Sequence, residues 1–254
     1  MNSEPPGTGA GQASAVPAVA PIPPLSAFEV RVGWLRLDLP AGFLGELTAT
    51  LSEEERHRAA RFIAEPHRHR FIAARGQLRA ALGRCLGTSA AEIELAYSAT
   101  GKPTLAGTFA TVGLHFNLSH SEDTAVFAVT LAGPVGIDVE RIRRLRDFDL
   151  LVTRFFSSRE QAAFLALPEG EKPGAFFHLW TRKEAWLKAT GAGLAGGLDQ
   201  VEVTFLPGEP ARFLSLPGVG HHPAGWSLHD LAAPAGFAAA VAVGAPGIQP
   251  GPFL

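Results

Sequence analysis

The 254-residue sequence is poor in cysteine, in charged residues and in long apolar runs, and each shortage excludes a class of protein. The single cysteine, Cys85, cannot form an intrachain disulfide, so we expect a reducing, cytoplasmic location. No segment approaches the roughly 18 uninterrupted apolar residues of a membrane-spanning helix. The N-terminus has Glu4 where a signal peptide carries basic residues, and prolines interrupt its apolar region. The formal net charge of −2 gives no sign of a nucleic-acid-binding protein, so we expect neither membrane nor nucleic acid as a partner.

What the chain does contain is a repeated order of expected elements. Residues 1–25 are rich in Pro, Ala, Gly and Ser and are expected to form a disordered tail. Residues 26–133 have the pattern strand, helix, helix and three strands, and residues 134–246 begin the same order again. Residues 247–254 are expected to be a second tail. We therefore predict an α+β fold in which two similar halves form a pseudodimer within one chain, with a ligand site in the cleft between them.

Similar signals mark the start of a helix in each half. Ser52 is followed three residues later by Glu55, and Ser157 is followed in the same way by Glu160. This spacing is typical of a capping box, in which the serine and glutamate side chains satisfy backbone N–H groups of the first turn.

The helices expected between residues 52 and 86 are strongly basic. Between Arg56 and Arg84 there are eight arginines and one acid, a net charge of +7. Most of these arginines are accounted for by a solvated helical face. An anion site for phosphate, or for an acidic protein partner, remains the functional alternative. Arg75 and Arg79 are one turn apart near the apolar face and are the better candidates for a pocket.

A short apolar strand at 135–140 carries two carboxylates on one face. Alternation along a strand points Asp138 and Glu140 to one side and Ile137 and Val139 into a core. The two carboxylates, about 6.6 Å apart by strand rise, could bind one hard cation such as Mg²⁺. Without a cation their repulsion costs on the order of 2–3 kcal/mol at an effective dielectric near 20. Such a pair alone is more often a solvated edge of a sheet.

A second element brings a third carboxylate and a lysine. On the helix expected from Pro173, Trp180, Glu184 and Lys188 lie on one stripe. A Glu–Lys pair at this spacing is by itself a routine surface salt bridge, but the tryptophan on the same side favours a partly buried location. Three carboxylates and a lysine from two elements are the components of a divalent-metal and phosphate site.

These motifs together resemble a known family. The sequence VGIDVE at 135–140, followed about forty residues later by WTRKEAWLKATGAGL at 180–194, is similar to the signature pair of the 4′-phosphopantetheinyl transferases. The GKP turn at 101–103 and FNLSHS at 116–121 resemble the larger, monomeric surfactin-type subfamily. The resemblance extends over about residues 30–243.

The resemblance implies a reaction and a metal site. The family transfers the phosphopantetheine arm of coenzyme A to a serine of an apo carrier protein and releases adenosine 3′,5′-bisphosphate. Asp138, Glu140 and Glu184 are then expected to bind Mg²⁺, with Mn²⁺ as a substitute, and Lys188 to neutralise phosphate charge in the transition state. Glu184 is also a candidate base for the carrier serine, unless the proton leaves through a metal-bound water.

The resemblance also implies how the other end of coenzyme A is held. Lys102, Ser119 and His120 are expected at the adenosine end, especially its 3′-phosphate, and Arg75 is a further phosphate contact. Without the resemblance, His120 would be interpreted as a structural histidine and Lys102 as an exposed turn lysine.

Two other functions use the same residues differently. A Mg²⁺-dependent phosphohydrolase acting on a nucleotide diphosphate would use the same carboxylates but need no carrier protein. A non-enzymatic module would bind acidic partners or nucleic acid through the helices of residues 52–86, with steep salt dependence and no need for Asp138.

Overall fold

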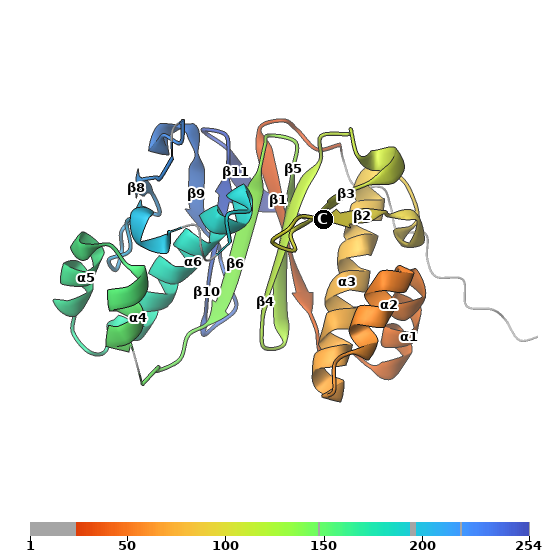
Figure 1. Ribbon diagram of the computed structural model, residues 1–254, viewed down its shortest axis with the longest axis horizontal. Helices are drawn as coiled ribbons and strands as arrows, with labels where there is room; N and C mark the ends of the chain where they lie inside the picture. The colour runs from red at the N-terminus through yellow and green to blue at the C-terminus, as the bar shows by residue number, and fades with distance from the viewer. Residues whose placement is uncertain (1–23, 147, 194–196, 219, 254) are drawn as a thin grey trace, which may run out of the picture.

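The computed structural model describes residues 24–146, 148–193, 197–218 and 220–253, which fold into two halves side by side (Figure 1). The expected tail at 1–25 lies almost entirely outside the described residues. The first half contains β1 (Glu29–Arg36), α1 (Ala41–Thr50), α2 (Glu53–Ala60), α3 (Glu65–Leu86), β2 (Leu95–Tyr97), β3 (Pro103–Leu105), β4 (His115–Ser121) and β5 (Thr124–Thr130).

The second half repeats this order. It contains β6 (Val135–Arg141), α4 (Phe148–Phe155), α5 (Ser158–Leu165), α6 (Lys172–Thr190), β7 (Glu202–Val203), β8 (Phe213–Ser215), β9 (Ser227–Asp230) and β10 (Phe237–Val243), and β11 (Gln249–Pro252) follows it. The predicted α+β fold and internal duplication are confirmed, with one helix more in each half than expected, α1 and α4. Among the described residues, no helix is both long and apolar enough to cross a membrane.

Strand pairing makes the duplication explicit. The two main sheets have the orders β11-β1-β5-β4 and β6-β10-β9, and within each half the pairing is antiparallel. Val30 of β1 pairs with the last residue of β5, Thr130, and Val135 of β6 pairs with the last residue of β10, Val243. Strands β1, β5 and β4 therefore correspond to β6, β10 and β9. The halves meet where β4 packs beside β6, near the centre of Figure 1.

Both predicted capping boxes form, and each contributes to a buried ion pair. The N3 glutamates, Glu55 and Glu160, cap α2 and α5 and also pair with a cation of the long helix that follows. Arg79 Nη1 lies 2.9 Å from Glu55, and Lys183 pairs in the same way with Glu160; all four side chains are at most 3% exposed. Removing one member of such a pair leaves an uncompensated buried charge, at a cost of about 3–5 kcal/mol.

This arrangement corrects the expectation that Arg79 faces a phosphate pocket. Besides Glu55, its guanidinium donates to the carbonyls of Ala90, Ala91 and Ile93. With its donors bound by the protein, Arg79 is a structural residue.

The expected C-terminal tail is also corrected, because its described part forms β11. This strand pairs in parallel with β1, from Glu29 opposite Gln249 to Val32 opposite Pro252. The ring of Phe253 then packs edge-on against Phe127, with centroids 4.8 Å apart. The segment contains two prolines, which an edge strand tolerates because one side of it needs no N–H donor.

The last feature that positions the site is the packing of α6 on β6. Ile137 and Val139 are fully buried, as predicted. Between β6 and α6, a Cβ at Gly136 would lie 2.0 Å from the carbonyl oxygen of Ala185, so only glycine allows this approach. The helix therefore lies directly against the strand, which brings Glu184 and Lys188 beside Asp138.

Candidate functional site

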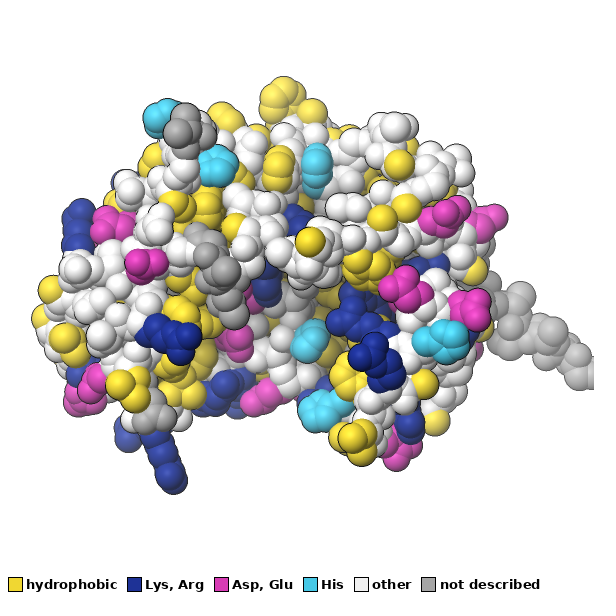
Figure 2. Space-filling model, in the orientation of Figure 1, with side chains coloured by type: hydrophobic (Ala, Val, Ile, Leu, Met, Phe, Trp, Pro, Cys, Tyr) yellow, Lys and Arg dark blue, Asp and Glu magenta, His cyan; other side chains and the backbone are white. Residues whose placement is uncertain are grey.

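A cleft of about 290 Å³ lies between the two halves. The first half lines it through α2, α3, the turn at 100–103 and β4, and the second half through the C-terminal part of α6. Figure 2 shows the hollow on this face, with Lys and Arg side chains gathered on the side of the first half. The lining residues are Arg58, Phe71, Ala74, Arg75, Thr100, Gly101, Lys102, Pro103, Asn117, Leu118, His120, Glu184, Leu187, Lys188, Gly191 and Gly193. A larger, open depression over α2 is lined by Arg79, whose donors are bound by the protein, and by none of the other residues predicted for the site.

The two strand carboxylates are each held by a serine of β4. Ser119 Oγ donates to Asp138 Oδ1 at 2.8 Å, and Ser121 Oγ donates to Glu140 Oε2 at 2.9 Å. Lys188 Nζ lies 2.5 Å from Asp138 Oδ1 and 2.9 Å from Ser119 Oγ. The structure thus brings Asp138, Glu140 and Lys188 together with Ser119 in one polar network, with Glu184 one helical turn from Lys188.

The donor set fits a divalent cation in its chemistry. Asp138 Oδ2 and Glu184 Oε1 are buried carboxylate oxygens that have no hydrogen-bond partner among the described residues, which is a costly condition for a charged acceptor. As the side chains are placed, no group of three His, Cys, Asp or Glu among the described residues could hold a metal ion. Two unpartnered oxygens from two elements, with Glu140 beside them, are nevertheless the hard oxygen ligands that Mg²⁺ prefers.

The raised pKa values of the carboxylates also favour a bound cation. Burial and, after it, the charge of the nearby Asp138 raise the pKa of Glu184 to about 7, although Lys188 opposes the shift. Burial and the charge of Asp138 also raise the pKa of Glu140. The cluster therefore resists three negative charges at once unless a cation or a proton joins it.

On the opposite wall, cations gather over an aromatic ring. The guanidinium of Arg75 lies 5.8 Å from the centroid of Phe71 and 5.6 Å from that of Tyr97. Arg58, which was not singled out from the sequence, lies 5.5 Å from the same Phe71. The pKa of His120 is lowered by burial and by the neighbouring positive charges, including Lys188. This wall is suited to an anionic ligand.

Two residues expected at the adenosine end have other partners. Lys102 Nζ donates to the carbonyls of Val135 at 3.1 Å and Ala189 at 2.9 Å, and burial lowers its pKa to about 8. It thereby ties the turn of the first half to β6 and α6 of the second. Ser119 is 5% exposed and directs its hydroxyl to Asp138 rather than into the cleft.

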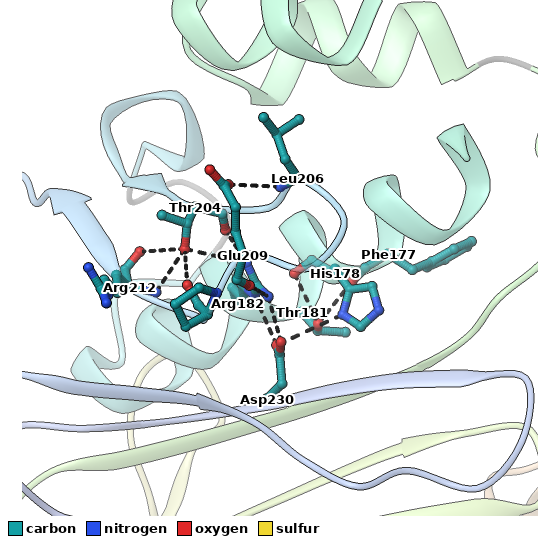
Figure 3. Close-up of polar contacts among 10 residues, drawn as sticks. Phe177, His178, Thr181, Arg182, Thr204, Leu206, Glu209, Arg212 and Asp230 are labelled. Atoms are coloured by element: carbon teal, nitrogen blue, oxygen red, sulfur yellow. Dashed lines mark hydrogen bonds and ion pairs between the residues drawn. The ribbon is translucent and has the colours of Figure 1, made fainter. Parts of the chain in front are cut away.

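A second polar network secures the other part of α6 (Figure 3). Arg182 holds Asp230 of β9 through two bonds, Nε–Oδ1 at 2.9 Å and Nη2–Oδ2 at 2.5 Å, and also donates to the carbonyl of Thr204. Burial tends to raise the pKa of Asp230, but His178 and Arg182 outweigh it and hold the pKa at about 2. Since Arg182 and Asp230 do not line the cleft between the halves, this network fixes the helix that carries Glu184 and Lys188.

Similar sequences among known proteins identify the family of the chain. Residues 134–242 match the model of the 4′-phosphopantetheinyl transferase superfamily, and residues 43–132 match that of the 4′-phosphopantetheinyl transferase N-terminal region. The chain is 43% identical over 222 residues to the 4′-phosphopantetheinyl transferase HetI of Nostoc sp., covering 87% of this chain and 90% of that protein. It is 30% identical over 153 residues to the 4′-phosphopantetheinyl transferase Sfp of Bacillus subtilis, covering 60% of this chain and 66% of that protein. The crystal structure of Thermotoga maritima holo-[acyl-carrier-protein] synthase aligns with a TM-score of 0.34 and 23% identity, over 44% of this chain and 63% of that chain. Two family matches in tandem, and a relative this similar over most of the chain, show that the protein belongs to the 4′-phosphopantetheinyl transferase family and is an enzyme of that class.

Proposed function

We propose that the protein transfers the 4′-phosphopantetheine arm of coenzyme A to a serine of an apo acyl or peptidyl carrier protein. The serine oxygen forms a bond to the phosphorus that bears the pantetheine arm, and the pyrophosphate bond to the nucleotide breaks. Adenosine 3′,5′-bisphosphate leaves, and the serine proton passes to a base. The observation that carries the proposal is a cleft with Glu184 on one wall, one of whose carboxylate oxygens has no hydrogen-bond partner among the described residues, and a cluster of cations on the other. Asp138 does not line the cleft itself but is bound to Lys188, which does.

The cationic wall would hold the nucleotide end of coenzyme A. Three side chains of this wall are available for its phosphates, Arg58, Arg75 and His120, because none of them forms an ion pair with a carboxylate in the part of the chain that the structure describes. Arginine suits this task because its fork of N–H groups matches phosphate oxygens. Lys102 and Ser119, which the family resemblance assigns to the same end, would have to exchange their protein partners for the ligand.

Asp138, Glu140 and Glu184 would bind Mg²⁺, with Mn²⁺ as a substitute. When bound, the ion supplies positive charge that polarises the pyrophosphate. Lys188, at the boundary between the two walls, would neutralise charge that builds on the phosphoryl oxygens. Glu184 has a pKa near neutrality, as a base for the serine hydroxyl requires.

We also infer a cytoplasmic monomer. The single cysteine supports a reducing compartment, and the internal duplication supports a site that is complete within one chain.

The test is to incubate the protein with coenzyme A, Mg²⁺ and a panel of apo carrier proteins, and to measure the intact mass of each carrier. We expect at least one carrier to gain one phosphopantetheine unit, and EDTA to prevent the gain. Release of adenosine 3′,5′-bisphosphate without carrier labelling would contradict transfer and indicate a phosphohydrolase.

Substitution of the carboxylates tests the site assignment. Asp138→Ala and Glu184→Ala should each reduce carrier labelling by at least 10³-fold, roughly 4 kcal/mol of transition-state stabilisation. Glu46→Ala, which changes an exposed carboxylate of α1, is the control and should leave the rate unchanged. Near wild-type labelling by Asp138→Ala would show that the carboxylates are misassigned.

A further inference from the structure

Strand β4 meets β6 through side chains rather than through a backbone ladder. Three alternate residues of β4 accept hydrogen bonds from three alternate backbone N–H groups of β6: Asn117 Oδ1 from Ile137 at 2.9 Å, Ser119 Oγ from Val139 at 3.4 Å, and Ser121 Oγ from Arg141 at 3.1 Å. Side chains of the first half therefore accept hydrogen bonds from backbone N–H groups of β6, an edge strand of the second half's sheet.

Each serine of this ladder makes a second bond, to the carboxylate that precedes its N–H partner. Ser119 donates to Asp138 and Ser121 donates to Glu140. A hydroxyl has one hydrogen to donate, so the hydrogen of Ser121 is committed to Glu140 Oε2 while its oxygen is anchored to the backbone of β6. The carboxylate is thereby fixed relative to its own strand.

We propose that Ser121 is a positioning residue that orients Glu140 to bind the divalent cation. The inference rests on the proposed function, and it assigns Ser121 a role distinct from binding coenzyme A. By fixing Oε2, Ser121 restricts rotation of the carboxylate and presents the remaining oxygen to the ion. Hydrogen-bond partners of metal ligands commonly contribute 10–100-fold to metal affinity through such orientation.

Substitution of Ser121 tests the orientation of a metal-binding carboxylate more specifically than substitution of Ser119 would. Ser119 also accepts a bond from Lys188, so its removal would disturb the ion pair with Asp138 as well. Ser121 has one carboxylate and one backbone N–H as its partners. Its removal therefore isolates the orientation of Glu140.

The duplicated fold supplies a matched control. Ser227 lies on β9, the strand that corresponds to β4, and is 7% exposed, against 8% for Ser121. Its hydroxyl accepts from Ile248 N at 3.0 Å and donates to Ala245 O at 2.7 Å. Ser227 thus makes the same pair of bonds between segments, but to a carbonyl instead of a carboxylate.

The experiment measures Mn²⁺ binding to the full chain by isothermal titration calorimetry, with coenzyme A present and carrier protein absent. Ser121→Ala is compared with Ser227→Ala, and Ser121→Thr with Ser121→Val, which have nearly the same shape and differ in the hydroxyl. We expect Ser121→Ala and Ser121→Val to weaken Mn²⁺ binding by about 10-fold or more, and Ser121→Thr and Ser227→Ala to stay within about twofold of wild type. In the transfer assay, the Mg²⁺ concentration for half-maximal rate should rise by the same factor, with kcat at saturating Mg²⁺ changing less.

Three results would overturn the inference: unchanged Mn²⁺ affinity in Ser121→Val, an equal loss in Ser227→Ala, or no difference between the Thr and Val variants. The Thr–Val comparison keeps the test valid if Ser121→Ala is too unstable to study. A wild-type protein that labels carriers without binding Mn²⁺ would also overturn it, while leaving phosphopantetheine transfer intact. Absence of labelling on every carrier would instead remove the proposed function, and the Mn²⁺ comparison would still decide the role of Ser121.

Discussion

Glu184 is the residue at which burial has the clearest consequence for protonation. Its pKa is about 7 in the folded chain, against an ordinary value of 4.5, because burial and the charge of Asp138 disfavour its charged form. The folded state therefore binds this proton more tightly than the unfolded state does. Stability is unaffected by the group below about pH 4.5 and falls as the pH rises from 4.5 to 7, where the unfolded chain releases the proton first.

The fall in stability with rising pH gives a prediction for the protein kept metal-free with EDTA. The melting temperature of wild type should decline between pH 5 and 7 more steeply than that of Glu184→Gln, which has no proton to lose at this position. Differential scanning calorimetry at intervals of half a pH unit measures both slopes. Equal slopes would show that Glu184 titrates normally. A divalent cation should reduce the difference by stabilising the charged form.

At the scale of elements, the contact of α6 with β6 depends on one missing side chain. Gly136→Ala would place its Cβ 2.0 Å from Ala185 O and 2.3 Å from Ala189 N, both backbone atoms of α6. The helix must then move away from the strand, which displaces Glu184 and Lys188 from Asp138. We expect a loss of about 2–3 kcal/mol in the free energy of unfolding and a large loss of transfer activity.

The control for this substitution is Gly45→Ala in α1. A Cβ there meets nothing within 4 Å, and alanine in a helix interior is favoured over glycine by roughly 0.5–1 kcal/mol. Urea unfolding of both variants measures the difference. A Gly136→Ala protein as stable and active as wild type would show that α6 can move without affecting the site.

Elements with a local signal were predictable from the sequence, and those without one were not. The capping boxes identified α2 and α5, and alternation identified β6 with its two carboxylates on one face. Helix α1 follows Pro40 and has no side-chain cap in the part of the chain that the structure describes, so no capping signal marks its start. Strand β11 is rich in proline and forms only because the edge of β1 is available far away in the sequence.

The prediction of the site was limited in the same way, because local sequence patterns do not contain the contacts between distant elements. The motifs named Asp138, Glu140, Glu184 and Lys188, because periodicity within one element determines which side chains share a face. Which of the eight arginines line the cleft depends on how α2 and α3 pack together around Phe71, and this packing is a tertiary property. The partnership of Ser121 with Glu140 likewise requires the register of β4 against β6, which no local pattern contains.

At the scale of the whole molecule, the fold is duplicated but the carboxylates of the site, Asp138, Glu140 and Glu184, belong to the second half. In the register of the sheets, Gly33 and Leu35 of β1 occupy the places of Asp138 and Glu140 in β6. On the long helices, Arg79 corresponds to Lys183, so Ala80 stands where the second half has Glu184. The corresponding space between β9 and β1 is filled by β11, to which Ser227 and His229 of β9 are bonded through Ile248. The described strands and helices therefore build one such carboxylate site, and both halves are needed to complete it.

A shared core predicts that the two halves unfold together. One buried apolar cluster combines Val30, Val126 and Ala128 of the first half with Val135, Ile137, Val139, Ala239, Val241 and Val243 of the second. Separating the halves would expose this cluster and break the side-chain ladder of β4, so a state with one half folded should not accumulate.

We expect a single calorimetric transition with equal calorimetric and van't Hoff enthalpies. Leu82→Ala and Leu228→Ala each truncate a leucine in a cluster whose buried members all belong to one half, and each should lower the whole transition, by about 2–5 kcal/mol in the free energy of unfolding. Two transitions, with each substitution shifting only the one that belongs to its own half, would mean that the interface lacks the strength to couple the halves and that the site is assembled from independently stable parts.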